Sequence, residues 1–233
     1  MTHAQIGGVR LFYELAGSGD PIVFVHGSQG DHRTWQAVVP HFARRFRVLT
    51  YDRRGHGQSE KPLGQPTGHA DVEDLAALVA QLGLPPAHFV GASFGAGVVL
   101  RLAAKKPELF RSVVAHEPPL LGALEEDSMA APDQLARAMR DTFATDPKVW
   151  VDEMRNPEAY RFDPDALLHF DRPVLLTRGD KTPRIVARVM MKLADTVRRG
   201  EWWTFAGAGL DPHVTHADEY AGLVEEFLDR ASS

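Results

Sequence analysis

The sequence predicts an α/β protein built on a doubly wound, mostly parallel sheet with a short helical cap insertion. Short runs of apolar, often β-branched residues alternate with segments of helical periodicity along the 233 residues. The runs in the middle of the chain are apolar at nearly every position, which is typical of parallel strands buried on both faces. A glycine-rich turn centred on Ser93 joins one of these runs directly to a helical segment.

Seven segments have the length and composition of strands. They cover residues 9–15, 22–26, 46–52, 87–93, 111–116, 173–178 and 202–205. In open parallel sheets, functional groups lie beyond the carboxyl ends of the strands. The residues that follow these segments are therefore the first candidates for a site.

Two helices are predicted from the periodicity of their apolar residues. Residues 71–82 place Val72, Leu75, Val79 and Leu82 on one face, and residues 216–228 do the same with Tyr220, Leu223, Val224, Phe227 and Leu228. Thr215 and Asp218 have the spacing of a capping box, so the second helix is expected to begin there.

Residues 118–169 interrupt the alternation, because they contain no convincing strand. Helical pieces separated by prolines are predicted at 133–143, 148–155 and 164–168. We expect this segment to form a cap over a core made of residues 1–117 and 170–233. Its apolar side chains could line a pocket or could pack between cap and sheet: Pro119, Leu120, Leu121, Met129, Met139, Phe143, Trp150 and Met154.

The composition argues against several classes of function. The formal net charge is −5, which gives no sign of a nucleic-acid or anionic-membrane partner. Cysteine is absent, which excludes disulfides, thiolate metal sites and a cysteine nucleophile. The apolar runs are far shorter than a membrane span, and the first residues lack a signal-peptide pattern. A cytoplasmic location is expected, and the sequence does not indicate an oligomeric state.

The turn at Ser93 has the pattern Gly-x-Ser-x-Gly, in Gly91-Ala92-Ser93-Phe94-Gly95. A strand that turns sharply into a helix at the serine leaves its hydroxyl exposed above the sheet, and bulky neighbours would collide with adjacent backbone. The helix N-terminus behind the serine offers N–H groups to a developing negative charge. The pattern therefore predicts a nucleophilic serine.

Other segments align with this turn and together carry a resemblance. They are Val25-His26-Gly27-Ser28, Asp52-Arg53-Arg54-Gly55-His56-Gly57-Gln58-Ser59 and Gly207-Ala208-Gly209-Leu210-Asp211-Pro212. In this order the set resembles the α/β-hydrolase fold family over essentially the whole chain outside the insertion. The resemblance implies that Ser93 is the nucleophile and that the N–H groups of Ser28 and Phe94 form the oxyanion hole. It implies a structural role for His26.

The carboxylate of the catalytic triad departs from the usual family pattern. The family often places it in the loop after the strand at 173–178, where this chain has Thr182, with Asp180 two residues earlier. A second family location lies one strand earlier, as in zearalenone-type lactone hydrolases, and Glu117 fits it. We expect Glu117 to be the acid, with Asp180 as the alternative.

The general base is the more serious departure. Leu210 stands where the family motif has its histidine, and leucine cannot accept a proton. His213 is the nearest substitute in sequence, although it could equally be a solvated or capping residue. His116 is a weaker candidate, because neighbouring side chains in a strand point to opposite faces.

Two functions remain open. The first is a serine hydrolase of small carboxylic esters or lactones that works through an acyl-enzyme on Ser93, impaired or repurposed because of Leu210. The second is a protein of the same fold that binds a small apolar ligand without catalysing hydrolysis. No cofactor and no metal are expected, since the paired histidines His213 and His216 have no evident third ligand.

Overall fold

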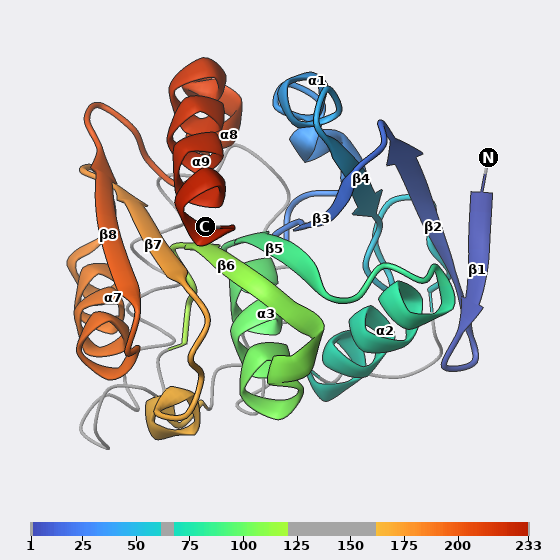
Figure 1. The fold of residues 1–233 in the computed structure, drawn as a ribbon, viewed down its shortest axis with the longest axis horizontal. Coiled ribbons are helices and arrows are strands. Elements are labelled where there is room, and N and C mark those ends of the chain that lie inside the picture. Colours follow the sequence, from blue (N-terminus) through green and yellow to red (C-terminus); the bar gives the residue numbers. More distant parts are fainter. Residues whose placement is uncertain (1, 62–67, 121–161, 233) are drawn as a thin grey trace.

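The computed structural model describes residues 2–61, 68–120 and 162–232. Their strands form one eight-stranded sheet with the order β1-β2-β4-β3-β5-β6-β7-β8 (Figure 1). The pairs β1–β2 and β2–β4 are antiparallel, and all other neighbours are parallel. The strands are β1 (Thr2–Ile6), β2 (Val9–Ala16), β3 (Asp20–Val25), β4 (Phe46–Tyr51), β5 (Ala87–Ala92), β6 (Phe110–His116), β7 (Val174–Gly179) and β8 (Gly200–Phe205).

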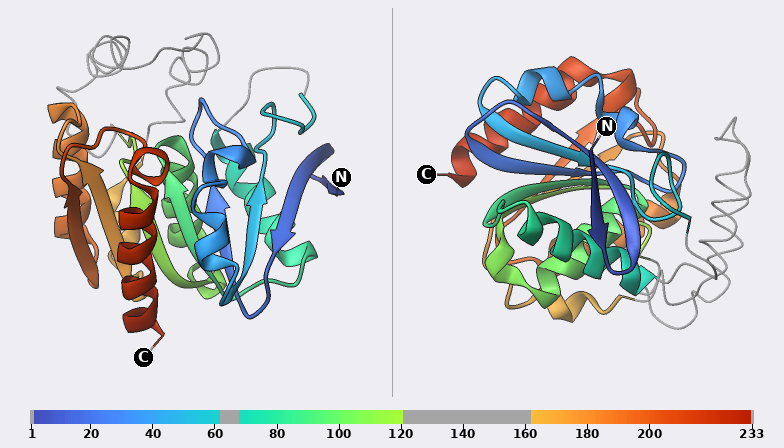
Figure 2. Two further views of the ribbon diagram at one scale, coloured as in Figure 1. Left: turned by 90° about the horizontal axis from the view of Figure 1, so that it is seen from above. Right: turned by 90° about the vertical axis from the view of Figure 1, so that its right-hand side faces the viewer.

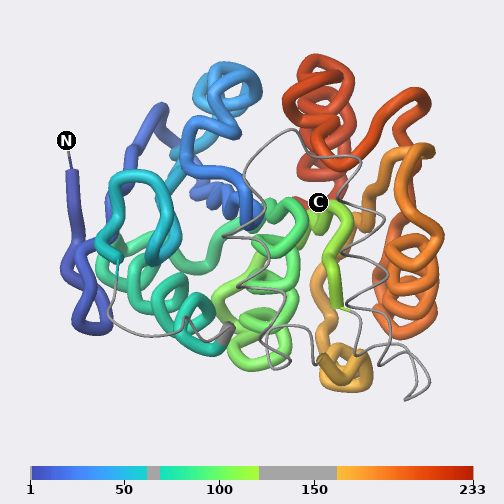
Figure 3. Tube along the Cα trace, turned by 180° about the vertical axis from the view of Figure 1, so that it is seen from behind, coloured from blue at the N-terminus to red at the C-terminus, as the bar shows by residue number. Residues whose placement is uncertain are grey.

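Helices cover both faces of this sheet (Figure 2). One face carries α2 (Gly68–Gln81), α3 (Phe94–Lys105) and α7 (Arg184–Thr196), which Figure 3 shows from behind. The other face carries α1 (Val39–Phe42), α8 (Pro212–Thr215) and α9 (Ala217–Ala231). Short 3₁₀ helices lie at η1 (His32–Trp35), η2 (Pro107–Leu109) and η5 (Pro164–Leu167).

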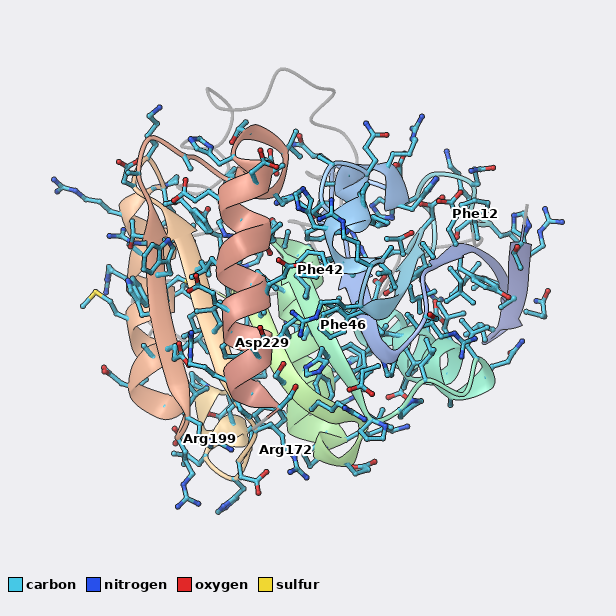
Figure 4. The ribbon with its side chains drawn as sticks, turned by 45° about the horizontal axis from the view of Figure 1, so that its top comes forward. Phe12, Phe42, Phe46, Arg172, Arg199 and Asp229 are labelled. Carbon is cyan, nitrogen blue, oxygen red and sulfur yellow. The ribbon has the colours of Figure 1, made fainter. Side chains whose placement is uncertain are left out.

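Alternating strand residues supply two separate apolar cores. In β3, Val23 and Val25 belong to the core under α2, α3 and α7, whereas Ile22 and Phe24 belong to the core under α1 and α9. This period of two is that of a strand buried on both faces. Phe42 and Phe46, labelled in Figure 4, lie in the second core. The predicted α/β class with a mostly parallel sheet is confirmed.

All seven predicted strands are present, each within two residues of its expected ends. The strand β1 was not predicted, because Thr2–Ile6 is largely polar and lies at the sheet edge, where one face meets water. The helices expected at 71–82 and 216–228 correspond to α2 and α9.

The expected capping box is wrong. His216, not Thr215, is the N-cap of α9, and no side-chain cap is formed. The Thr215 hydroxyl instead donates to the Asp211 carbonyl at 3.1 Å, within the preceding turn α8.

The cap remains a prediction. Its pieces at 133–143 and 148–155 lie outside the described residues, and the piece at 164–168 is the 3₁₀ helix η5. The division into a core of residues 1–117 and 170–233 and an insertion at 118–169 is therefore untested. Among the helices that the structure describes, none is both long and apolar enough to cross a bilayer.

Candidate active site

Ser93 sits at the junction of β5 and α3 in a backbone conformation that is rare for a side chain. Its φ is 51° and its ψ is −123°. Both flanking glycines are required by close backbone approach: a Cβ on Gly91 would lie 2.6 Å from the Ala96 Cα, and one on Gly95 would lie 2.2 Å from the Val25 carbonyl oxygen. The turn therefore depends on the whole Gly-x-Ser-x-Gly pattern.

The loop after β3 passes directly over this turn. A Cβ on Gly27 would lie 3.1 Å from the Cβ of Ser93 and 3.6 Å from its Oγ. Ser28, the next residue, is buried. The structure thus brings the loop that carries Ser28 to the hydroxyl of Ser93 and to the first turn of α3, where Phe94 begins the helix.

Glu117 follows β6 and also has a left-handed backbone, with φ 47°. Its buried Oε1 accepts hydrogen bonds from the Gly179 N–H at 2.8 Å and from the Thr182 hydroxyl. Its Oε2 has no hydrogen-bond partner among the described residues. Burial raises the pKa of Glu117 to about 7, against the lowering effect of the two hydrogen bonds. Thr182 therefore holds a carboxylate that comes from the neighbouring strand.

The alternative acid, Asp180, points elsewhere. It is exposed, and its Oδ2 accepts the Gly207 N–H at 2.9 Å. This bond fixes the loop after β8, which leads to Leu210. Of the two carboxylates, Glu117 is the buried one with a free oxygen. Asp180 is exposed and binds the backbone of the loop after β8.

The loop that carries Leu210 lies beside the strand end that binds Glu117. The Ala208 carbonyl accepts the Lys181 N–H at 3.1 Å, and a Cβ on Gly179 would lie 2.2 Å from that same carbonyl oxygen. Gly179 is also the residue whose N–H binds Glu117. Leu210 is buried in the core that contains Phe94. Position 210 and the Glu117 carboxylate therefore flank the same strand end.

His213 packs in a different place. Its ring lies 4.4 Å from that of Trp35 and 5.7 Å from that of Tyr220, and both of these residues belong to the core under α1 and α9. Neither ring nitrogen forms a hydrogen bond with a described residue. Burial lowers the pKa of His213 to about 3. An efficient general base has a pKa near the working pH, so this environment gives His213 no support as the base.

His116 corrects an expectation. Its Nε2 lies 3.6 Å from Glu117 Oε1, although neighbouring strand side chains were expected to diverge. The reason is the left-handed backbone of Glu117, which ends the strand and turns the carboxylate back. The His116 Nδ1 lies 2.9 Å from the Thr177 hydroxyl oxygen, and burial lowers the pKa of the ring well below its usual value.

A family model described as the alpha/beta hydrolase fold matches residues 20–166. The chain belongs to the α/β-hydrolase fold family. The match includes Ser28, Ser93 and Glu117 and ends before position 210.

Two of the similar proteins are named as hydrolases. The chain is 33% identical over 139 residues to the uncharacterised hydrolase YraK of Bacillus subtilis strain 168, a match that covers 58% of this chain and 51% of YraK. It thus spans about half the length of that relative. It is 26% identical over 269 residues to the 2-hydroxymuconate semialdehyde hydrolase of Pseudomonas sp. strain CF600, covering 97% and 93% of the two chains.

Solved structures support the fold. The enol-lactonase from Burkholderia xenovorans LB400 superposes with a TM-score of 0.79 at 23% identity, covering 98% of this chain and 100% of that one. At this identity, the likeness shows that the two chains share the α/β-hydrolase fold.

One group of described side chains, Asp31, His32 and Asp52, has ligand atoms close enough to hold a metal. Its atoms already have partners. Both Nδ1 and the backbone N–H of His32 donate to Asp52 Oδ1 at 2.7 Å. Asp31 pairs with Arg33, with an N–O distance of 2.5 Å. These hydrogen bonds and the ion pair explain why the three side chains lie together without an ion.

The buried His213 ring, which has no hydrogen bond to a described residue and lies 4.0 Å from Asp211 Oδ1, makes stability sensitive to acid. In the unfolded chain a histidine has a pKa near 6.5, whereas the pKa of His213 in the folded protein is about 3. Between these two pH values, the folded protein keeps His213 neutral while the unfolded chain binds a proton. The contribution of neutral His213 to the free energy of unfolding is therefore complete above pH 6.5 and is lost as the pH falls below that value. His213→Phe keeps the ring packing but cannot be protonated. We expect its free energy of unfolding, relative to that of the wild type, to be about 2 kcal/mol higher at pH 5 than at pH 7.5.

Chemical denaturation at the two pH values measures this gain. A stability difference that is the same at pH 7.5 and pH 5 would show that His213 is protonated in the folded protein.

Proposed function

We propose that the protein is a serine hydrolase of small carboxylic esters or lactones that forms an acyl-enzyme on Ser93 and releases it slowly. The observation that carries the proposal is the strained Ser93 turn, which lies beneath the Gly27–Ser28 loop at the N-terminus of α3. The family membership and the hydrolase names of its relatives support the reaction class.

In the proposed acylation step, the Ser93 Oγ attacks the carbonyl carbon of the ester. The carbonyl oxygen gains negative charge, and the N–H groups of Ser28 and Phe94 stabilise it. The bond to the leaving oxygen then breaks, and the alcohol departs with the proton that Ser93 loses. An activated leaving group, such as p-nitrophenolate, needs little help from an acid.

Release of the acyl group is the step that Leu210 impairs. Water must lose a proton as it attacks the acyl-enzyme, and position 210 offers no base. Binding and the oxyanion hole still supply about 10³–10⁴-fold over the uncatalysed reaction when a triad member is missing. The substrate is a small molecule, and the reaction requires no cofactor.

The test is a burst experiment with p-nitrophenyl acetate, using Ser93→Ala as the control. We expect about one equivalent of p-nitrophenol in a burst, together with an acetyl adduct in the intact mass of the wild type alone. Sustained turnover that is lost in Ser93→Ala would show that another residue acts as the base. The proposal would be overturned if the wild type released p-nitrophenol no faster than Ser93→Ala and carried no acetyl adduct.

A second candidate function follows from Leu210 alone. A buried leucine in place of a base suits a protein that binds a small apolar ligand and does not turn it over. In that case, a non-hydrolysable apolar amide should bind saturably, while reactive esters leave no adduct on Ser93. The same mass measurement therefore separates the two functions.

A further inference from the structure

We propose that Arg53 is a positioning residue that orients both N–H groups of the oxyanion hole. The inference rests on the proposed function, which assigns the N–H groups of Ser28 and Phe94 to the developing oxyanion. Arg53 follows β4 and is almost completely buried, although it carries a charge. Buried charges are retained where they are paired and hydrogen-bonded.

The Ser28 N–H is held through the Gly27 carbonyl. The two groups belong to one peptide unit, which is planar and trans, so they point in opposite directions. The Gly27 carbonyl accepts a hydrogen bond from His26 Nδ1 at 2.7 Å. A fixed carbonyl on one side of the peptide fixes the N–H on the other. The His26 ring therefore sets the direction of the Ser28 N–H.

Arg53 in turn holds His26. The backbone N–H of Arg53 donates to His26 Nε2 at 2.9 Å, which requires the ring proton to be on Nδ1, where it meets the Gly27 carbonyl. Its Nε donates to the His26 carbonyl at 3.1 Å. Burial, aided by the Arg53 charge, lowers the pKa of His26 well below its usual value, which keeps this neutral tautomer.

The same guanidinium reaches the second donor. Its carbon lies 4.5 Å from the centre of the Phe94 ring, a cation–π contact with the residue that carries the other N–H. Its Nη1 donates to Asp71 of α2 at 3.2 Å. One side chain thus links the loop after β3, the start of α3 and the neighbouring helix. A lysine has a single ammonium group and cannot present donors in these directions while stacking on a ring.

The next residue, Arg54, provides a matched control. It comes from the same motif and pairs with the same helix, through two hydrogen bonds to Asp74 at 2.7 and 2.6 Å. Arg54→Gln therefore removes a charge and an ion pair to α2 without touching His26 or Phe94. If Arg53 only stabilised the fold, the acylation rates of the two variants would simply follow their unfolding temperatures.

The experiment measures single-turnover acylation of Ser93 by p-nitrophenyl acetate in the full chain, with thermal unfolding measured in parallel. We expect Arg53→Met to lower the maximal acylation rate about 100-fold with little change in the half-saturating ester concentration, which is the magnitude of losing one oxyanion donor. Arg53→Lys should lie in between. Arg54→Gln should stay within about three-fold of the wild type, since it leaves both donors in place.

A second measurement does not depend on activity. The backbone amide signals of Ser28 and Phe94 in an NMR spectrum should both move in Arg53→Lys and should stay in place in Arg54→Gln. Acylation at the wild-type rate in Arg53→Met, or losses in both variants that simply follow their unfolding temperatures, would overturn the inference. A wild type that forms no adduct would instead overturn the proposed function, while the amide signals would still decide whether Arg53 positions these groups.

Discussion

An imidazole placed at position 210 should speed release of the acetyl group from Ser93 by about 10³-fold or more. The substitution that introduces this imidazole is Leu210→His. The loop that carries Leu210 is anchored to Gly179 and Lys181, and Gly179 also holds the Glu117 carboxylate. The free oxygen of that carboxylate, Glu117 Oε2, is then available to orient an imidazole. The measurement is the decay of the acetyl adduct by mass, together with steady-state turnover.

Leu210→Gln is the control for this gain. Glutamine is similar in size and can form hydrogen bonds, but it cannot act as a base at neutral pH. Equal rates in the two variants would show that position 210 does not face the acyl group. Adding Glu117→Gln to Leu210→His should remove most of the gain. A gain that survives this change would exclude Glu117 as the orienting acid.

Gly95→Ala should destabilise the fold by about 3 kcal/mol or more. The added Cβ would lie 2.2 Å from the Val25 carbonyl oxygen and 2.5 Å from that of His26. Both contacts are with backbone, so no side chain can rotate away. Either α3 or the end of β3 must move, and both carry parts of the site. Urea denaturation followed by far-ultraviolet circular dichroism measures the loss.

Gly222→Ala provides the opposite case in the same scaffold. Gly222 lies inside α9, and a Cβ there meets no atom within 4 Å. We expect this variant to be more stable by about 0.5–1 kcal/mol, because alanine is the better helix former. If Gly95→Ala and Gly222→Ala changed the free energy of unfolding by similar amounts, the close backbone approach at Gly95 would not be a determinant of stability.

The parts of the fold that the sequence predicts are those set by local pattern. Strands such as β3 and β5 are apolar on both faces, and the Ser93 turn is encoded within five residues. The strand β1 escapes prediction because an edge strand needs few apolar residues. The capping box fails because Thr215 is the last residue of the preceding turn α8, so that His216 becomes the N-cap of α9.

The candidate site depends on contacts that no local pattern shows. Glu117 and Thr182 are 65 residues apart, and they meet because β6 and β7 pair with His116 opposite Thr177. The left-handed backbone at Glu117 then turns the carboxylate toward β7. Sequence alone nominates Glu117 and notes Thr182 only as the residue that replaces the usual acid, and the strand register brings the two side chains together.

Ser93 and Glu117 are the non-glycine residues with positive φ in the described part of the chain. Each such conformation costs on the order of 1–3 kcal/mol, which glycine would largely avoid. In a population selected only for folded abundance, glycine should therefore spread at both positions. A lineage that had lost all use for this end of the sheet would be expected to drift the same way. Serine and glutamate at these two positions therefore lower the stability of the fold relative to glycine, and loss of both would be the first sign that this end of the sheet no longer serves a purpose.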